Sequence, residues 1–130
     1  MDRKSPGYLL DTHILYWMDQ APDRLSAAAR ALLGEADESI YCSAASLWEL
    51  AIKQSLGKLN IGRKLTALVR TYQLLELPVT AAHAEAAADL PLHHRDPFDR
   101  MLIAQAKVEG LILMTADQRL HSYDVAILRC

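Results

Sequence analysis

Residues 96–117 read DPFDRMLIAQAKVEGLILMTAD, and this stretch decides the fold that we expect for the chain. Asp96 is a good N-cap residue and Pro97 suits the first position of a helix, so a long helix begins here. The helix continues until Gly110, which stops it. The apolar run Leu111–Met114 then predicts a buried strand. A capped helix followed directly by a buried strand is typical of α/β folds with a parallel sheet.

The rest of the chain repeats this alternation of short apolar runs and amphipathic stretches. Ser43 and Thr80 are expected N-caps of two further helices, and Gly57 ends the first of them. The expected strands lie near Tyr8–Leu10, Ser39–Cys42, Leu75–Pro78, Leu111–Met114 and Val125–Leu128. The expected helices lie after Asp11, at Leu25–Glu35, from Ser43 to Leu56, at Lys64–Tyr72, from Thr80 to Leu90 and at Pro97–Glu109. The pattern predicts an α/β fold in which βα units form a parallel sheet.

Length and charge set bounds on the fold and its partners. The chain has 130 residues, of which 52% are hydrophobic, so we expect a single domain over residues 1–130. The formal net charge of −2 counts mildly against a nucleic-acid partner. If four of the 16 acidic residues are clustered on a metal, 12 remain against 14 basic ones. The remaining surface is then slightly basic.

One segment is distinctly basic. Between Leu50 and Leu75 the sequence has no acidic residue and five basic ones, namely Lys53, Lys58, Arg63, Lys64 and Arg70. Such a segment forms either a solvated helix face or a surface that faces phosphates, and the sequence leaves both interpretations open.

Cysteine content and hydropathy indicate the compartment. Cys42 and Cys130 are too few for a disulfide framework, which favours a reducing environment. No apolar run reaches the ~20 residues that span a membrane. Residues 1–7 lack the apolar core of a secretion signal. We therefore expect a cytoplasmic protein with no membrane partner.

Acidic residues stand where a metal site of an α/β protein would need them. Asp11 and Asp117 each follow an expected strand, and active sites of open parallel sheets gather outside the carboxyl ends of the strands. If the fourth strand neighbours the first, these two acids lie side by side. Glu49 and the pair Asp96 and Asp99 add further carboxylates, which are ligands that Mg²⁺ and Mn²⁺ prefer.

Each acid also has a purely structural interpretation. Asp11 and Asp117 are suitable cap or turn residues, and Asp96 is a well-formed N-cap. Asp99 suits the positive end of a helix. Glu49 pairs with Lys53 one turn later, a contact worth only ~0.2–0.5 kcal/mol. The functional interpretation therefore depends on all of these acids meeting in one place.

The order and spacing of four motifs resemble the PIN domain family, and most closely the toxins of VapBC type II toxin–antitoxin systems. The matching stretches are Leu9-Leu10-Asp11-Thr12-His13, Trp48-Glu49-Leu50, the run from His94 to Ala106, and Leu113-Met114-Thr115-Ala116-Asp117. The resemblance covers nearly the whole chain. It implies a three-layer α/β/α fold with a central parallel sheet.

The resemblance also implies a function and its residues. It implies an endoribonuclease that uses Mg²⁺ or Mn²⁺, with catalytic carboxylates at Asp11, Glu49, Asp99 and Asp117. The metal ligands would be Asp11, Asp99 and Asp117, with Asp96 and Thr115 as nearby supporting residues. A cognate antitoxin and an RNA substrate are the implied partners, and we expect a homodimer. Our candidates for RNA contacts are Lys53, Arg95 and Arg100.

Other functions fit the sequence less well. A phosphorelay receiver domain needs two adjacent acids after the first strand and a lysine after the last, but Thr12 follows Asp11 and the last strand is followed by Arg129. An aspartyl phosphatase needs Asp-x-Asp, but position 13 is histidine. An inactive PIN scaffold that only binds a partner stays open. We expect His13, His93 and His94 to be solvated or near helix caps, since adjacent histidines lack the spacing of a structural zinc site.

Overall fold

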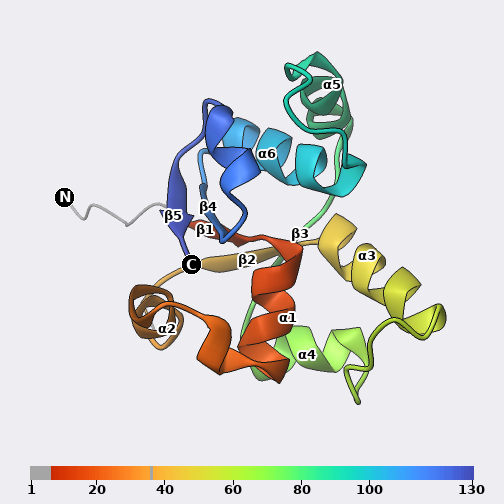
Figure 1. The fold of residues 1–130 in the computed structure, drawn as a ribbon, viewed down its shortest axis with the longest axis vertical. Helices are drawn as coiled ribbons and strands as arrows, with labels where there is room; N and C mark the ends of the chain where they lie inside the picture. Colours follow the sequence, from red (N-terminus) through yellow and green to blue (C-terminus); the bar gives the residue numbers. More distant parts are fainter. Residues whose placement is uncertain (1–6, 36) are drawn as a thin grey trace.

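The computed structural model describes residues 7–35 and 37–130, which form a five-stranded sheet between two layers of helices (Figure 1). The strand order is β3-β2-β1-β4-β5, and all neighbouring strands are parallel. The strands are β1 (Tyr8–Leu10), β2 (Ile40–Ser43), β3 (Leu75–Leu77), β4 (Ile112–Thr115) and β5 (Ile127–Arg129). The predicted central parallel sheet is confirmed.

Within residues 7–35 and 37–130, six α-helices and two 3₁₀ turns connect the strands. The helices are α1 (Thr12–Gln20), α2 (Ala27–Leu33), α3 (Ala44–Ser55), α4 (Leu65–Thr71), α5 (Ala81–Asp89) and α6 (Pro97–Glu109), and the turns are η1 (Pro22–Arg24) and η2 (Gln118–Ser122). Each predicted helix is present. The predicted caps Ser43, Thr80 and Asp96 each accept a hydrogen bond from the first turn of their helix.

The differences from the predicted boundaries have local causes. Helix α2 begins later than expected because Ser26 caps it, accepting from the backbone of Ala29. Strand β4 begins at Ile112 because the N–H of Leu111 donates to Ala106 and closes the end of α6. Strand β5 begins at Ile127 because the N–H of Val125 donates to Tyr123 in a turn. The turn η2 was not predicted at all.

The sheet buries a core on each face. Adjacent residues of a strand point to opposite faces, and Leu9 and Leu10 accordingly belong to different cores. The core around Leu10, Ile14 and Leu68 packs under α1, α2, α3 and α4. The core around Leu9 and Leu102 packs under α5 and α6, which lie on the other side of the sheet (Figure 1). This is the predicted three-layer α/β/α arrangement.

The central strands place the acidic residues. β1 pairs with both β2 and β4, with Leu10 opposite Met114. Helix α1 leaves β1 toward one face, whereas α6 enters β4 from the other, so the sheet has a switch point between β1 and β4. Asp11 and the residues after Met114 therefore meet at one edge, as the sequence predicted.

Three further predictions concern the compartment. Cys42 and Cys130 are free thiols, in agreement with the sequence analysis. In the described part of the chain, none of the helices has the length and apolar character that a membrane crossing requires. The prediction about a secretion signal rests mainly on residues 1–6, which lie outside the described residues.

Candidate functional site

A polar cleft of about 250 Å³ opens at the carboxyl edge of the sheet. Five carboxylates from four parts of the chain line it: Asp11, Glu49, Asp96, Asp99 and Asp117. Two cationic side chains, Lys53 and Arg119, line it as well. The structure thus brings all four acids of the predicted catalytic set, and the nearby Asp96, to one place.

Asp11 is the most deeply buried of these acids, with 1% of its surface exposed. It is the N-cap of α1, and its Oδ1 accepts from the backbone of Thr12 at 2.7 Å. Its Oδ2 accepts from the Thr115 hydroxyl at 2.6 Å, so β4 holds the carboxylate of β1 in place. Burial, together with repulsion from the nearby charges of Asp117 and Glu49, raises the pKa of Asp11 to about 6.

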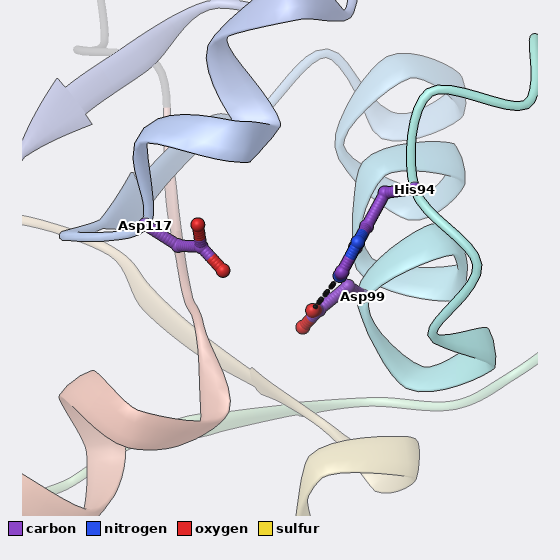
Figure 2. Close-up of side chains that lie close together, drawn as sticks. All are labelled: His94, Asp99 and Asp117. Atoms are coloured by element: carbon purple, nitrogen blue, oxygen red, sulfur yellow. Dashed lines mark hydrogen bonds and ion pairs between the residues drawn. The ribbon is translucent and has the colours of Figure 1, made fainter.

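Asp99 projects from the first turn of α6 into the same cleft. Burial, together with repulsion from Asp11, raises its pKa to about 6. Its Oδ2 lies 2.6 Å from Nε2 of His94, a contact that Figure 2 marks with a dashed line. His94 is only 10% exposed at its side chain and lies two residues before the N-cap Asp96, so of the two environments expected for it, the one near a helix cap applies. His93 next to it is exposed.

Asp117 follows β4 and faces the cleft from the opposite side (Figure 2). Its two oxygens accept from the guanidinium of Arg119 at 2.7–3.2 Å. These hydrogen bonds hold the pKa of Asp117 below its usual value. The backbone N–H of Asp117 donates to the Thr115 hydroxyl at 3.0 Å, so Thr115 contacts two of the four acids.

Glu49 supplies the clearest sign of a missing positive charge. Its Oε2 pairs with Lys53 at 3.1 Å, the one-turn contact expected from the sequence. Its Oε1 is buried and has no hydrogen-bond partner among the described residues. A buried charged oxygen without a partner is costly, and a divalent cation in the cleft would remove that cost. The same cation would neutralise the repulsion that raises the pKa of Asp11 and Asp99, so these residues fit an oxygen-bound metal ion.

The supporting residues predicted from the sequence occupy different environments. The Oδ1 of Asp96 accepts from the backbone of Phe98 at 2.8 Å and of Asp99 at 3.3 Å, which is the geometry of an N-cap. Lys53 lies at the cleft and Arg95 is exposed. Arg100 instead donates to four backbone carbonyls in the last turn of α5 and in the segment between α5 and α6, namely those of Ala87, Leu90, Pro91 and His94. This geometry gives Arg100 a structural role and leaves little of its guanidinium for RNA.

Three residues at the site were not among the predicted functional residues. His94 contacts Asp99, Arg119 contacts Asp117, and His13 lies with Nδ1 3.3 Å from Asp11. Arg119 follows Asp117 by two residues, a spacing that suggests a local ion pair. The signal for His94 is weaker, because its contact with Asp99 depends on the path of the loop before α6.

The metal-free protein is expected to lose stability as pH rises through the pKa of Asp11. Because the folded pKa is raised to about 6, the folded state binds a proton more tightly than the unfolded state. The contribution of Asp11 to the free energy of unfolding is then highest at low pH and falls between about pH 4 and pH 7. Asp11→Asn removes this penalty and should gain about 1–3 kcal/mol over wild type at pH 7.5, with little gain at pH 4.

Urea unfolding in EDTA at the two pH values measures this difference. Asp124→Asn is the matched control, because Asp124 is exposed. An advantage of Asp11→Asn that is equal at both pH values would contradict the assignment of the raised pKa.

Comparison with known proteins identifies the family. The model of the family described as PIN domain matches residues 8–126. The chain is 36% identical over 123 residues to Ribonuclease VapC22 of Mycobacterium tuberculosis (strain ATCC 25618 / H37Rv), and the alignment covers 88% of this chain and 90% of that protein. The similarity therefore extends over nearly the full length of that protein.

Solved structures share the fold. VapBC2 from Rickettsia felis, bound to a DNA fragment from its promoter, superposes with a TM-score of 0.71 at 17% identity and covers 94% of this chain and 97% of that chain. DNA-bound VapBC from Salmonella typhimurium gives a TM-score of 0.70 at 16% identity and covers 96% and 98%. Similarity at these identities shows the fold alone. The family match and the mycobacterial relative also show the family: this chain belongs to the PIN domain family.

Proposed function

We propose that this protein is a metal-dependent endoribonuclease and the toxin of a toxin–antitoxin pair. The observation that carries the proposal is the convergence of Asp11, Glu49, Asp99 and Asp117 in one cleft, where Oε1 of Glu49 is buried without a hydrogen-bond partner among the described residues although Lys53 and Arg119 line the same cleft. The mycobacterial relative is named a ribonuclease, which supports the same chemistry here. Metal-dependent cleavage of RNA by the purified chain, abolished by EDTA, is the test.

The contacts described above suggest a role for each residue of the cleft. A bound Mg²⁺ or Mn²⁺ would polarise the phosphate and lower the pKa of a water molecule. Asp11, Asp99 and Asp117 would hold the ion, and Glu49 would complete the carboxylate set. Thr115 fixes the orientation of Asp11 through its hydroxyl, and Asp96 fixes the first turn of α6 that carries Asp99.

Cationic side chains at and beside the cleft would hold the RNA backbone. Lys53 and Arg119 line the cleft, and Arg95 is exposed close by in sequence to Asp99. The positive field of such groups attracts phosphates and fixes the strand without reading its bases. Arg119 is the better candidate than Arg100, because its side chain is 67% exposed.

The basic segment between Leu50 and Leu75 gives a testable extension of this surface. Lys58 and Lys64 are exposed, whereas Arg63 pairs with Asp19 at 3.3 Å and supports the fold. The double variant Lys58→Glu and Lys64→Glu should weaken RNA binding about tenfold at low salt. With fewer phosphate contacts, binding releases fewer counterions from the RNA, and that release drives the association. Filter binding at several salt concentrations measures the loss.

The control for this variant is Lys107→Glu, an exposed position near the end of α6. Mn²⁺ affinity and antitoxin binding should be unchanged in both variants. If the double variant binds RNA as wild type does, the segment is a solvated helix face.

The proposed partner is an antitoxin that covers the acidic cleft. The neighbours from Rickettsia felis and Salmonella typhimurium are VapBC assemblies, in agreement with such a partner. A basic side chain of the antitoxin would be attracted to the carboxylates. Such an enzyme meets its RNA in the cytoplasm, which is the location we propose. The homodimer expected from the sequence stays a prediction that sedimentation equilibrium tests.

The alternatives are less well supported. The family match favours a PIN domain over a phosphorelay receiver. An inactive scaffold would not need four carboxylates in one cleft, and cleavage by the purified chain separates it from an enzyme.

A further inference from the structure

One nitrogen donor stands among the carboxylates of the cleft. Nε2 of His94 lies 2.6 Å from Oδ2 of Asp99, and Asp117 faces both from across the cleft (Figure 2). One ligand atom from each of His94, Asp99 and Asp117 lies within 4.8 Å of the other two. Two ligands of one divalent ion are at most about 4–5 Å apart, so the three side chains are close enough to share an ion.

The fold holds the imidazole in this position. The backbone N–H of His94 donates to the hydroxyl of Tyr123 at 2.9 Å, and its carbonyl accepts from Arg100 at 3.3 Å. Tyr123 is itself 5% exposed. The loop before α6 is therefore anchored to the segment after β4, and the position of His94 does not depend on Asp99 alone.

The other two nearby histidines are engaged elsewhere. Nε2 of His13 accepts from the backbone N–H of Ala116 at 3.3 Å, so its proton is on Nδ1, which faces Asp11. His93 is exposed and packs edge-on against the ring of Tyr123 at 5.0 Å between centroids. Among the described residues, His94 is thus the imidazole placed to meet an ion between Asp99 and Asp117.

We propose that His94 is a nitrogen ligand of the divalent cation, together with Asp99 and Asp117, and that it makes the site prefer Mn²⁺ to Mg²⁺. This inference rests on the proposed function, which supplies the cation. Mg²⁺ is held by oxygen and gives up its waters reluctantly, whereas imidazole nitrogen suits transition ions. A nitrogen in the ligand set therefore changes the relative affinity of the two ions.

The contacts that His94, Asp99 and Asp117 make in the structure are compatible with this role. The hydrogen bond between His94 and Asp99 is replaced when both bind the ion, with the imidazole proton on Nδ1. The pair of Asp117 and Arg119 lies at the surface, where solvent weakens it, and Arg119 is free to swing away. Neither contact holds a ligand atom out of reach.

A second role for His94 makes a different prediction. If it only donated to Asp99 and oriented that carboxylate, its loss would weaken Mg²⁺ and Mn²⁺ binding alike. A nitrogen ligand, in contrast, contributes mainly to the affinity for Mn²⁺. His94→Gln separates the two, because the glutamine amide still donates to Asp99 and has no imidazole nitrogen.

The test is pulsed electron paramagnetic resonance of Mn²⁺ bound to the full chain, with calorimetric titration of Mn²⁺ and Mg²⁺. Wild type and the control His93→Gln should show the ¹⁴N modulation of a directly bound imidazole, and His94→Gln should lack it. His94→Gln should also weaken Mn²⁺ binding about tenfold or more and change Mg²⁺ binding less than about threefold. Circular dichroism confirms that each variant is folded.

The outcomes separate this inference from the function on which it rests. If wild type binds Mn²⁺ without nitrogen modulation and still cleaves RNA, His94 is not a ligand and the proposed nuclease stands. If His94→Gln leaves the binding of both ions unchanged, or weakens both equally, His94 only orients Asp99 and is not a ligand. If wild type binds neither ion, the carboxylate site and the ligand role of His94 both fail.

Discussion

Asp99→Asn is expected to lower RNA cleavage by on the order of 10³-fold while the protein stays folded. The substitution keeps the shape of the side chain and removes a negative charge that would hold the metal ion. Because burial and Asp11 raise the pKa of Asp99 to about 6, the loss of its charge costs the metal-free fold nothing at neutral pH. Single-turnover cleavage in Mg²⁺ or Mn²⁺ measures the activity, and calorimetry with Mn²⁺ should show strongly weakened binding. Asp11→Asn should behave in the same way.

Asp96→Asn is the matched control for this prediction. Asp96 lies three residues before Asp99, lines the same cleft and caps the same helix. Asparagine is as good an N-cap as aspartate, so the first turn of α6 should be preserved. Cleavage should fall far less than in Asp99→Asn. The reverse order would show that Asp96 is the metal-binding acid, and cleavage that persists in excess EDTA would point to a metal-free ribonuclease.

Induced expression of the wild-type chain alone is expected to arrest the growth of a bacterial host. An endoribonuclease that is not inhibited destroys RNA that the cell needs, and co-expression of a cognate antitoxin should restore growth. Glu49→Gln and Asp117→Asn should relieve the arrest without any antitoxin, because each removes a carboxylate from the cleft. Colony counts and growth curves measure the effect. Growth that continues at high expression of the wild type, with no copurifying partner, would exclude a toxin and favour a housekeeping nuclease or a scaffold.

Elements defined by local signals were predictable from the sequence. The N-caps Ser43, Thr80 and Asp96 and the stop at Gly110 act within a few residues, and each lies where it was expected. Gly110 adopts a left-handed conformation with a φ of 67°, which glycine tolerates without strain. Strand order is not local: the sequence left open whether β1 and β4 are neighbours, and the structure shows that they pair.

The sequence did not reveal some contacts of the site, because these contacts depend on the paths of loops. The position of His94 is set by Tyr123 and Arg100, which lie 29 and 6 residues away in the chain. The engagement of Arg100 with backbone carbonyls was equally hidden, since a basic residue beside an acidic motif suggests a phosphate contact. The sequence therefore indicated which carboxylates meet, and the fold determines which of their neighbours they touch.

The bond between Thr115 and Asp11 joins residues that are 104 positions apart. Strand β1 is made early in synthesis, but its carboxylate acquires its β4 partner only after nearly the whole chain has left the ribosome. A nascent chain that ends before Ile112 lacks β4, Thr115 and Asp117 and so has no complete cleft. Because β1 pairs with β4, the cleft is complete only when translation is almost finished, and the ribonuclease activity that we propose would begin only then.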